Sequence, residues 1–222
     1  MQSRKIKPGI SLVVVIVTGV LANWIIYSYT TDYAGPITAA LLTTLCTVLL
    51  RINDSSWKEL GFTKPKKTIR LIWQIPLILV SIYLIVGLYT YLFTEILGFD
   101  IPDQKRFDGM EGNLKMLIKW LIISWIVGAF MEEFIFRGFL INYMEKLLGS
   151  FRYSTAIAVI TQAFLFATVH YYNRGLIGAI SIFLLSSILG FYYIKFKRNL
   201  WPLILAHGIM NTLSFIADYL GS

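Results

Sequence analysis

The sequence predicts an all-α membrane protein, a polytopic bundle of about seven transmembrane helices, with eight as the alternative count. Hydrophobic residues make up 57% of the 222-residue chain and charged residues only 14%, whereas a soluble globular domain has about 25% charged residues. The mean hydropathy is +0.68, and apolar runs of about 20 residues, the length needed to cross the hydrocarbon core, recur throughout. Because the helices of such a bundle share one interior, we expect a single integral membrane domain over residues 1–222.

The predicted spans alternate with basic or turn-rich segments. The first span follows Arg4, Lys5 and Lys7. Its apolar core is too long for a signal peptide and no small-residue cleavage site follows it, so we expect it to be retained. The third contains Pro76, where we expect a bend, and the fourth ends before Lys146. The spans cover residues 10–30, 33–50, 71–97, 114–145, 153–172, 176–194 and 200–220.

The distribution of basic residues orients this bundle in the membrane. Cytoplasmic loops of membrane proteins carry an excess of lysine and arginine. With the N-terminus inside, the inner segments hold most of the 20 basic residues, whereas most acidic residues fall in outer segments. We therefore expect a cytoplasmic N-terminus and an outer C-terminus. The net charge of +8 then anchors the chain at the lipid bilayer, and no nucleic-acid partner is expected.

Two adjacent carboxylates and an arginine interrupt the apolar fourth span, in the stretch Phe-Met-Glu-Glu-Phe-Ile-Phe-Arg at residues 130–137. Charged side chains at membrane depth are costly and usually face a bundle interior or a water-filled cavity. On a helix Glu133 and Arg137 are four residues apart, so they can pair on one face. Such a pair can be simply structural. Glu132 points about 100° away and is the carboxylate left for chemistry.

The chain has only two histidines, and both lie in predicted membrane helices. Imidazole exchanges protons readily near neutral pH and also binds metals. His207 and Asn211 are four residues apart and can point at one spot, where an amide beside an imidazole suits an oxyanion or a positioned water. A carboxylate that takes a proton from water can complete a hydrolytic site with His170. Each residue alone also has a structural interpretation, the histidines as packing elements and Asn211 as a hydrogen bond between helices.

Three short motifs occur in this order: Glu-Glu-x-x-x-Arg from Glu132, Phe-x-x-x-His from Phe166 and His-x-x-x-Asn from His207. Together they resemble the motifs of the CPBP family of CAAX-type and bacteriocin-processing (Abi) intramembrane endopeptidases. The motifs span residues 130–211, within a family-like catalytic core of about 114–220. The resemblance implies an all-helical intramembrane hydrolase with a catalytic cavity that water can reach, in which Glu133 and Arg137 brace the fourth helix.

The resemblance also implies roles for the other motif residues. By the family's pattern, Glu132 and His170 would activate the attacking water, while His207 and Asn211 would stabilise the oxyanion. The substrate would be a membrane-associated protein or peptide precursor, prenylated or not. We expect an integral protein of a bacterial cell membrane, and the sequence does not indicate an oligomeric state.

A metal-dependent site is the alternative. Glu132, His170 and His207 make a plausible zinc set with an open coordination position, and the family has been discussed both as metallopeptidases and as glutamate-dependent peptidases. The sequence lacks a His-Glu-x-x-His motif, and the three ligands would come from separate helices. We therefore expect a metal-free site without a cofactor.

Helix lengths predict a difficulty for any site that joins these residues. At about 1.5 Å per residue, Glu132, His170 and His207 lie about 20, 27 and 13 Å from the nearest predicted inner boundary. They can meet only if helices are tilted or broken, or if the boundaries lie elsewhere.

Two non-proteolytic functions compete with the protease. Intramembrane Glu, His and Arg also mark ion pathways in transporters, although transporters commonly show paired repeats and none is visible here. A bacteriocin-immunity membrane protein or a regulatory partner is the other alternative, which the intact motifs disfavour.

Overall fold

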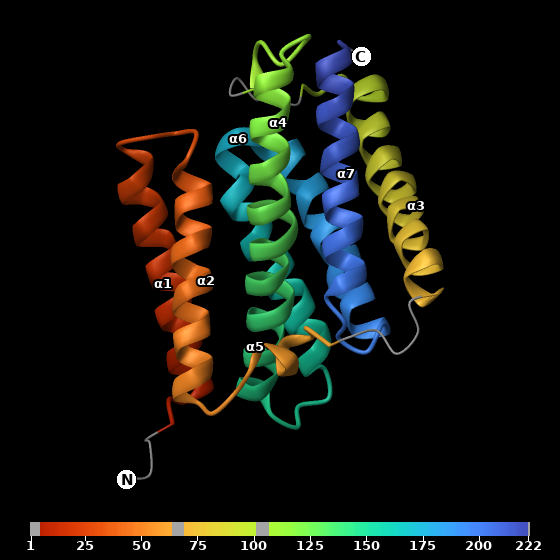
Figure 1. The fold of residues 1–222 in the computed structure, drawn as a ribbon. Helices are drawn as coiled ribbons and strands as arrows, with labels where there is room; N and C mark the ends of the chain where they lie inside the picture. Colours follow the sequence, from red (N-terminus) through yellow and green to blue (C-terminus); the bar gives the residue numbers. More distant parts are fainter. Residues whose placement is uncertain (1–4, 64–68, 101–106, 222) are drawn as a thin grey trace.

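A computed structural model describes residues 5–63, 69–100 and 107–221. The described chain is helical, with no strand, which confirms the all-α prediction (Figure 1). Its elements are α1 (Pro8–Tyr27), α2 (Ala34–Ile52), η1 (Trp57–Leu60), α3 (Ile69–Tyr91), η2 (Leu92–Ile96), α4 (Leu114–Ile123), η4 (Ser124–Ile141), α5 (Asn142–Leu148), α6 (Ser154–Lys195) and α7 (Trp201–Leu220).

Six helical segments of the described residues are long and apolar enough to cross a membrane. Helices α4, η4 and α5 form one of them, a continuous rod over Leu114–Leu148. Pro76 lies inside α3, and the bend expected there stays a prediction. The large apolar side chains on α1 and α3 that face outward are in a position to contact lipid. They include Val13, Val20, Trp24, Ile72, Leu84 and Leu88.

Helix α6 contains a chain reversal, which accounts for the difference between six segments and seven predicted spans. Gly175 has φ 61° and ψ −171°, outside the helical region. The Gln162 side chain bonds the Ser186 carbonyl at 3.1 Å, although the two residues would be about 36 Å apart on a straight helix. The first arm (residues 154–174) and the second arm (176–195) therefore lie side by side. Each arm is about 20 residues long, enough for one membrane crossing.

Replacing Gly175 tests this reversal. Its backbone conformation is essentially restricted to glycine, so Gly175→Ala is expected to destabilise the protein by about 1–3 kcal/mol, measured by unfolding in detergent. Gly87 on α3 is the matched control, because a Cβ there meets nothing within 4 Å. Gly87→Ala is expected to be neutral or stabilising by up to about 1 kcal/mol. Equal effects of the two substitutions on stability would show that position 175 does not require a residue with positive φ.

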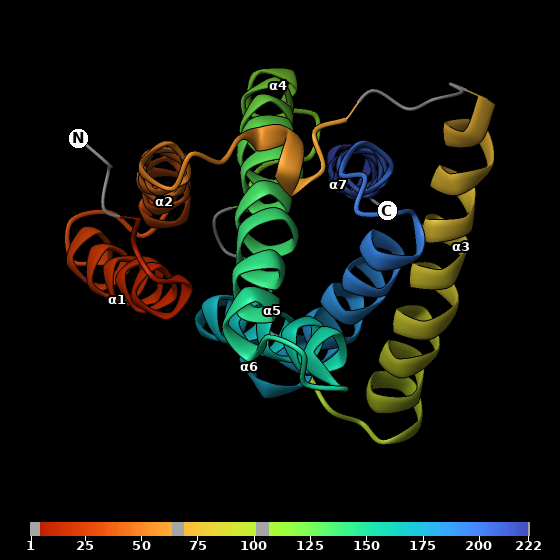
Figure 2. The same cartoon turned by 90° about the horizontal axis from the view of Figure 1, so that it is seen from below.

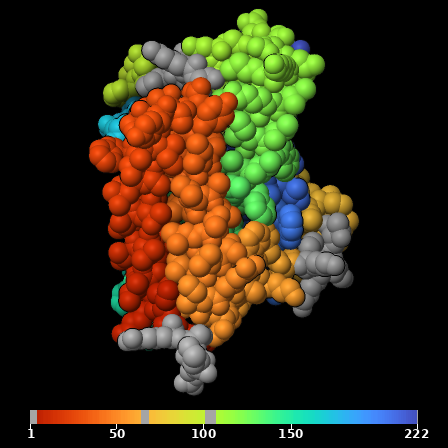
Figure 3. All heavy atoms as spheres, turned by 60° about the vertical axis from the view of Figure 1, so that its left-hand side comes forward, coloured from red at the N-terminus to blue at the C-terminus, as the bar shows by residue number. Residues whose placement is uncertain are grey.

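The rod formed by α4, η4 and α5 lies at the centre of the bundle. Seen along the helices, α1 and α2 flank it on one side and α7 and α3 on the other (Figure 2). Helices α1 and α2 run side by side and cover one face of the molecule (Figure 3). Helix η4 is wound as a π-helix and is buried almost without interruption from Glu133 to Ile141. Wide π turns occur frequently at functional sites, and η4 is the element that carries both glutamates.

Helix α7 begins well inside the bundle. Its preceding residue, Leu200, donates its backbone N–H to the Gly61 carbonyl at 3.1 Å and packs against Gly138, which lies inside the rod rather than at its end. Arg198 reaches back to Glu145, with Nη2 and Oε1 3.0 Å apart. The loop before α7 is therefore bonded to the rod. These contacts set the depth of His207 along the rod, which the sequence does not reveal.

Candidate active site

A buried hydrogen-bonded group joins the first and third motifs. Oε1 of Glu133 accepts hydrogen bonds from Arg137 Nη1 at 3.0 Å and from His207 Nδ1 at 2.9 Å. The side chains of Glu133 and Arg137 are fully buried and that of His207 is 7% exposed. The ion pair of Glu133 with Arg137 is therefore present, as its helical spacing predicts. Its contact with His207 could not be read from the sequence.

Arg137 is also held by both arms of α6. Its Nη2 donates to the Ser186 hydroxyl on the second arm at 2.8 Å. Its guanidinium lies 4.8 Å from the ring centre of Phe166 on the first arm. A buried charge needs several such partners, and Arg137 finds them on its own helix and on both arms.

The register of η4 against the first arm of α6 places Glu132 and His170 at the same level. The two helices run in opposite directions, and the rings of Phe136 and Phe166 meet edge to face with centroids 4.8 Å apart. Glu132 lies one turn before Phe136, and His170 lies one turn after Phe166. Because the helices are antiparallel, both residues lie one turn from the ring contact in the same direction. Glu132 is half-buried and interacts electrostatically with Arg137.

The orientation of the His170 ring is fixed by its own helix. Its Nδ1 lies 2.9 Å from the Phe166 carbonyl oxygen, and its ring packs on the Phe166 ring at 4.6 Å. A carbonyl oxygen only accepts hydrogen bonds, so Nδ1 carries the proton. Nε2 of neutral His170 is then a lone-pair acceptor, which suits a base.

Asn211 lies one turn beyond His207, close to the backbone of η4. A Cβ at Gly128 would come within 3.1 Å of the Asn211 amide nitrogen, and one at Gly208 within 2.5 Å of the Trp125 ring. These two glycines let α7 lie close against η4. Trp125 Nε1 also donates to the Thr212 hydroxyl at 3.0 Å. Asn211 is thereby held at the level of the turn that precedes Glu132.

These registers resolve the depth difficulty through different helix boundaries. The rod ends at Leu148 and α6 begins at Ser154, so Glu132 and His170 lie equally many residues from the ends of their hairpin. Because α7 begins inside the bundle, His207 lies at the depth of Glu133 and bonds it. Boundaries that lie elsewhere, one of the three conditions named for a joint site, therefore account for the predicted difference of depths.

A zinc site does not follow from these side chains. In the described residues, no three His, Cys, Asp or Glu side chains gather closely enough to hold a metal ion. Nδ1 of His207, one of the three ligands that the sequence suggests, already bonds Glu133.

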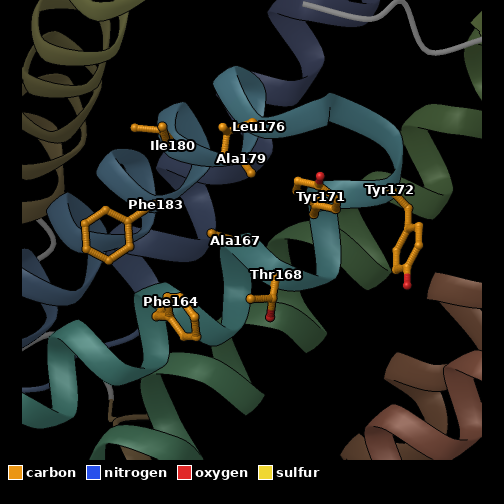
Figure 4. A pocket seen from close by; sticks show the side chains of 9 residues that line it. All are labelled: Phe164, Ala167, Thr168, Tyr171, Tyr172, Leu176, Ala179, Ile180 and Phe183. Carbon is orange, nitrogen blue, oxygen red and sulfur yellow. The ribbon is translucent and has the colours of Figure 1, made fainter.

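Two apolar cavities lie between helices of the bundle, and none of the six predicted site residues lines them. One, of about 450 Å³, lies between the two arms of α6 and includes Ala167 and Tyr171, which flank the level of His170 (Figure 4). The other, of about 440 Å³, lies between α3, the second arm of α6 and α7, and includes Met210. The water-filled cavity implied by the family resemblance is therefore not one of these two.

Sequence reasoning missed two polar residues of this region. Gln162 and Ser186 are 1% and 0% exposed and belong to none of the three motifs. The only signal in the sequence is that each is a polar residue inside an apolar run.

Comparison with known proteins identifies a related family for this region. Residues 114–213 match the family described as type II CAAX prenyl endopeptidase Rce1-like. The match covers α4, η4, α5, α6 and most of α7, a little under half of the chain, and contains all three motifs. It confirms the family resemblance over these residues. The search of curated proteins found no match, and neither did the search of solved structures.

Proposed function

We propose that the chain is an intramembrane endopeptidase that cleaves a peptide bond of a membrane-associated protein or peptide precursor. Two residues, Glu132 and His170, activate the water. Two others, His207 and Asn211, hold the oxyanion. The observation that carries the proposal is the hydrogen bond from His207 to Glu133, because it joins the first and third motifs inside the region that matches CAAX endopeptidases.

The proposed reaction begins with a water between η4 and the first arm of α6. Glu132 takes a proton from this water, and Nε2 of His170 accepts a hydrogen bond from it. The water oxygen attacks the scissile carbonyl and gives a tetrahedral oxyanion. Glu132 then passes its proton to the leaving amine, so that the carboxylate is regenerated and both products are released.

The oxyanion is stabilised from α7. The Asn211 amide donates one hydrogen bond. Nδ1–H of His207 is engaged by Glu133, so the imidazole can donate to the oxyanion only through a proton on Nε2. The resulting imidazolium is compensated by the Glu133 carboxylate. In this proposal Glu133 therefore acts on the reaction through His207.

Metal dependence is tested directly on the purified enzyme. A metal-free mechanism predicts full cleavage activity after dialysis against a chelator and less than one zinc per chain by elemental analysis. Stoichiometric zinc, with activity lost on chelation and restored by metal, would replace the glutamate mechanism but retain the protease.

The substrate class is tested by cleavage in detergent or liposomes. Prenylated CAAX peptides, their unprenylated counterparts and membrane-anchored peptide precursors are incubated with the protein, and products are identified by mass spectrometry. We expect cleavage of at least one class at one bond. Proton-coupled solute flux that Glu132→Gln abolishes, without cleavage of any peptide, would instead support a transporter.

We also propose that the N-terminus lies in the cytoplasm of a bacterial cell. The basic segments next to α1 and between α2 and α3 support this orientation. A reporter that is active only in the cytoplasm should be active when fused before α1 and inactive after α7.

A further inference from the structure

We infer that Gln162 and Ser186 are positioning residues of the proposed active site, which fix Arg137 and through it the hydrogen bond from His207 to Glu133. This inference rests on the proposed function for its kinetic test. Its spectroscopic test does not depend on activity.

Five side chains, from Gln162 through Ser186, Arg137 and Glu133 to His207, form a continuous buried relay of hydrogen bonds. Arg137 Nη2 donates to the Ser186 hydroxyl at 2.8 Å, and that hydroxyl donates to Gln162 Oε1 at 3.3 Å. On the other side, Arg137 Nη1 donates to the oxygen of Glu133 that also accepts from His207. Arg137 and Ser186 are 0% exposed and Gln162 is 1% exposed, so water is not positioned to replace these partners.

The far end of the relay is anchored on the backbone. Gln162 Nε2 donates to the carbonyls of Val159 and Ser186, both at 3.1 Å. Gly190 makes this possible, because a Cβ there would come within 2.9 Å of both Gln162 Nε2 and Val159. The amide is therefore fixed in one orientation, with its oxygen directed at the Ser186 hydroxyl. The relay therefore depends on the close approach of the two arms of α6, because Gln162 lies on the first arm and Ser186 on the second.

The relay affects the position of His207 because His207 and Arg137 donate to the same acceptor. Arg137 Nη1 and His207 Nδ1 both bond the same oxygen of Glu133. Without the Ser186 hydroxyl, the guanidinium loses the contact that keeps Nη2 directed away from Glu133. It can then rotate on the Phe166 ring and bond both oxygens of Glu133, the bidentate geometry that arginine favours. That rotation displaces the His207 imidazole and its Nε2.

The kinetic test uses Ser186→Ala with Ser187→Ala as its matched control. The Ser187 hydroxyl bonds only the Phe183 carbonyl of its own helix among the contacts described for it. We expect Ser186→Ala to lower kcat about 10–100-fold, the scale of a displacement of about 1 Å, with KM changed less than about 3-fold. Ser187→Ala should retain wild-type values, and Ser186→Thr, which keeps the hydroxyl, should recover most of kcat. If Ser186→Ala and Ser187→Ala have equal kcat, the inference is wrong.

The spectroscopic test follows the His207 ring directly. The chain has two histidines, so protein labelled with ¹⁵N-histidine gives two sets of ring nitrogen signals. They are assigned with His170→Gln. We expect Ser186→Ala to shift the His207 ring signals and leave those of His170 in place. Unchanged His207 signals would show that Ser186 supports only the packing of α6.

A second variant keeps the test decisive if Ser186→Ala does not fold. Gln162→Met has a similar shape and removes the acceptor of the Ser186 hydroxyl, so the same shift of the His207 signals is expected, of smaller size. Its absence would overturn the inference. The proposed function fails separately: if Glu132→Ala cleaves peptides as well as wild type, the catalytic roles are wrong whatever the His207 signals show.

Discussion

Glu132→Ala is expected to lower kcat for peptide cleavage by about 10²–10⁴-fold, the contribution typical of a general base. Glu132 lies level with His170 across the antiparallel helices, whereas Glu133 holds the buried bonds to Arg137 and His207. Glu132→Gln should have the same effect, because an amide does not accept the proton of the water. The measurement is initial rates with a peptide substrate found by mass spectrometry.

Replacing a residue that holds the oxyanion is also expected to lower kcat. Asn211→Ala is expected to lower kcat by about 10²–10³-fold, the usual loss of one oxyanion donor. Substrate binding should survive in both variants, since neither residue is needed for remote substrate contacts. Glu111 is exposed and serves as the control glutamate, whose replacement by alanine should leave kcat unchanged. Full activity in Glu132→Gln together with loss in a normally folded Glu133→Gln would reverse the two roles.

Arg137→Leu is expected to destabilise the folded protein by about 3–5 kcal/mol, because it leaves Glu133 as a buried charge without its ionic partner. Glu133→Leu should cost a similar amount. The double variant should cost clearly less than the sum of the two, because it removes both charges. Unfolding of the four proteins in detergent by a denaturing surfactant gives the coupling free energy.

An exposed ion pair provides the comparison for this cycle. Lys5 and Asp54 lie 3.4 Å apart and are each 64% exposed. Because solvent and salt screen such pairs, the same cycle there should give a coupling of at most about 1 kcal/mol. Equal couplings at both pairs would contradict a structural role for the buried pair.

The contact between His207 and Glu133 changes the meaning of the two glutamates. Helical spacing correctly predicts that Glu133 is the glutamate that pairs with Arg137. It does not show that Glu133 also holds the histidine of the third motif. In the proposed mechanism Glu133 is therefore linked to the oxyanion through His207, in addition to bracing its own helix with Arg137.

The helix count and most helix boundaries follow from the sequence, because burial of the backbone in lipid requires apolar runs of fixed minimum length. The predicted spans 10–30 and 33–50 correspond to α1 and α2. The break between the fifth and sixth spans was also predicted, at residues 173–175, which include the non-helical Gly175. Local composition determines these features, so no tertiary information is needed.

The chemistry of the site follows from the sequence only as an inventory of residues. The chain has two histidines, and charged residues inside a membrane span are rare because they are costly there. For that reason Glu132, Glu133 and the histidines stand out without any structure. The spacing of four residues also determines that Glu133 bonds Arg137, since both lie on one helix.

Only the tertiary structure decides which residues meet across helices. Register and depth are set by contacts between elements distant in sequence, such as the Phe136 and Phe166 rings and the loop that ties Arg198 to Glu145. Gln162 and Ser186 form their relay because Gly175 reverses the chain between them. Sequence periodicity describes one helix at a time, and the offset between two helices depends on packing that no single helix contains.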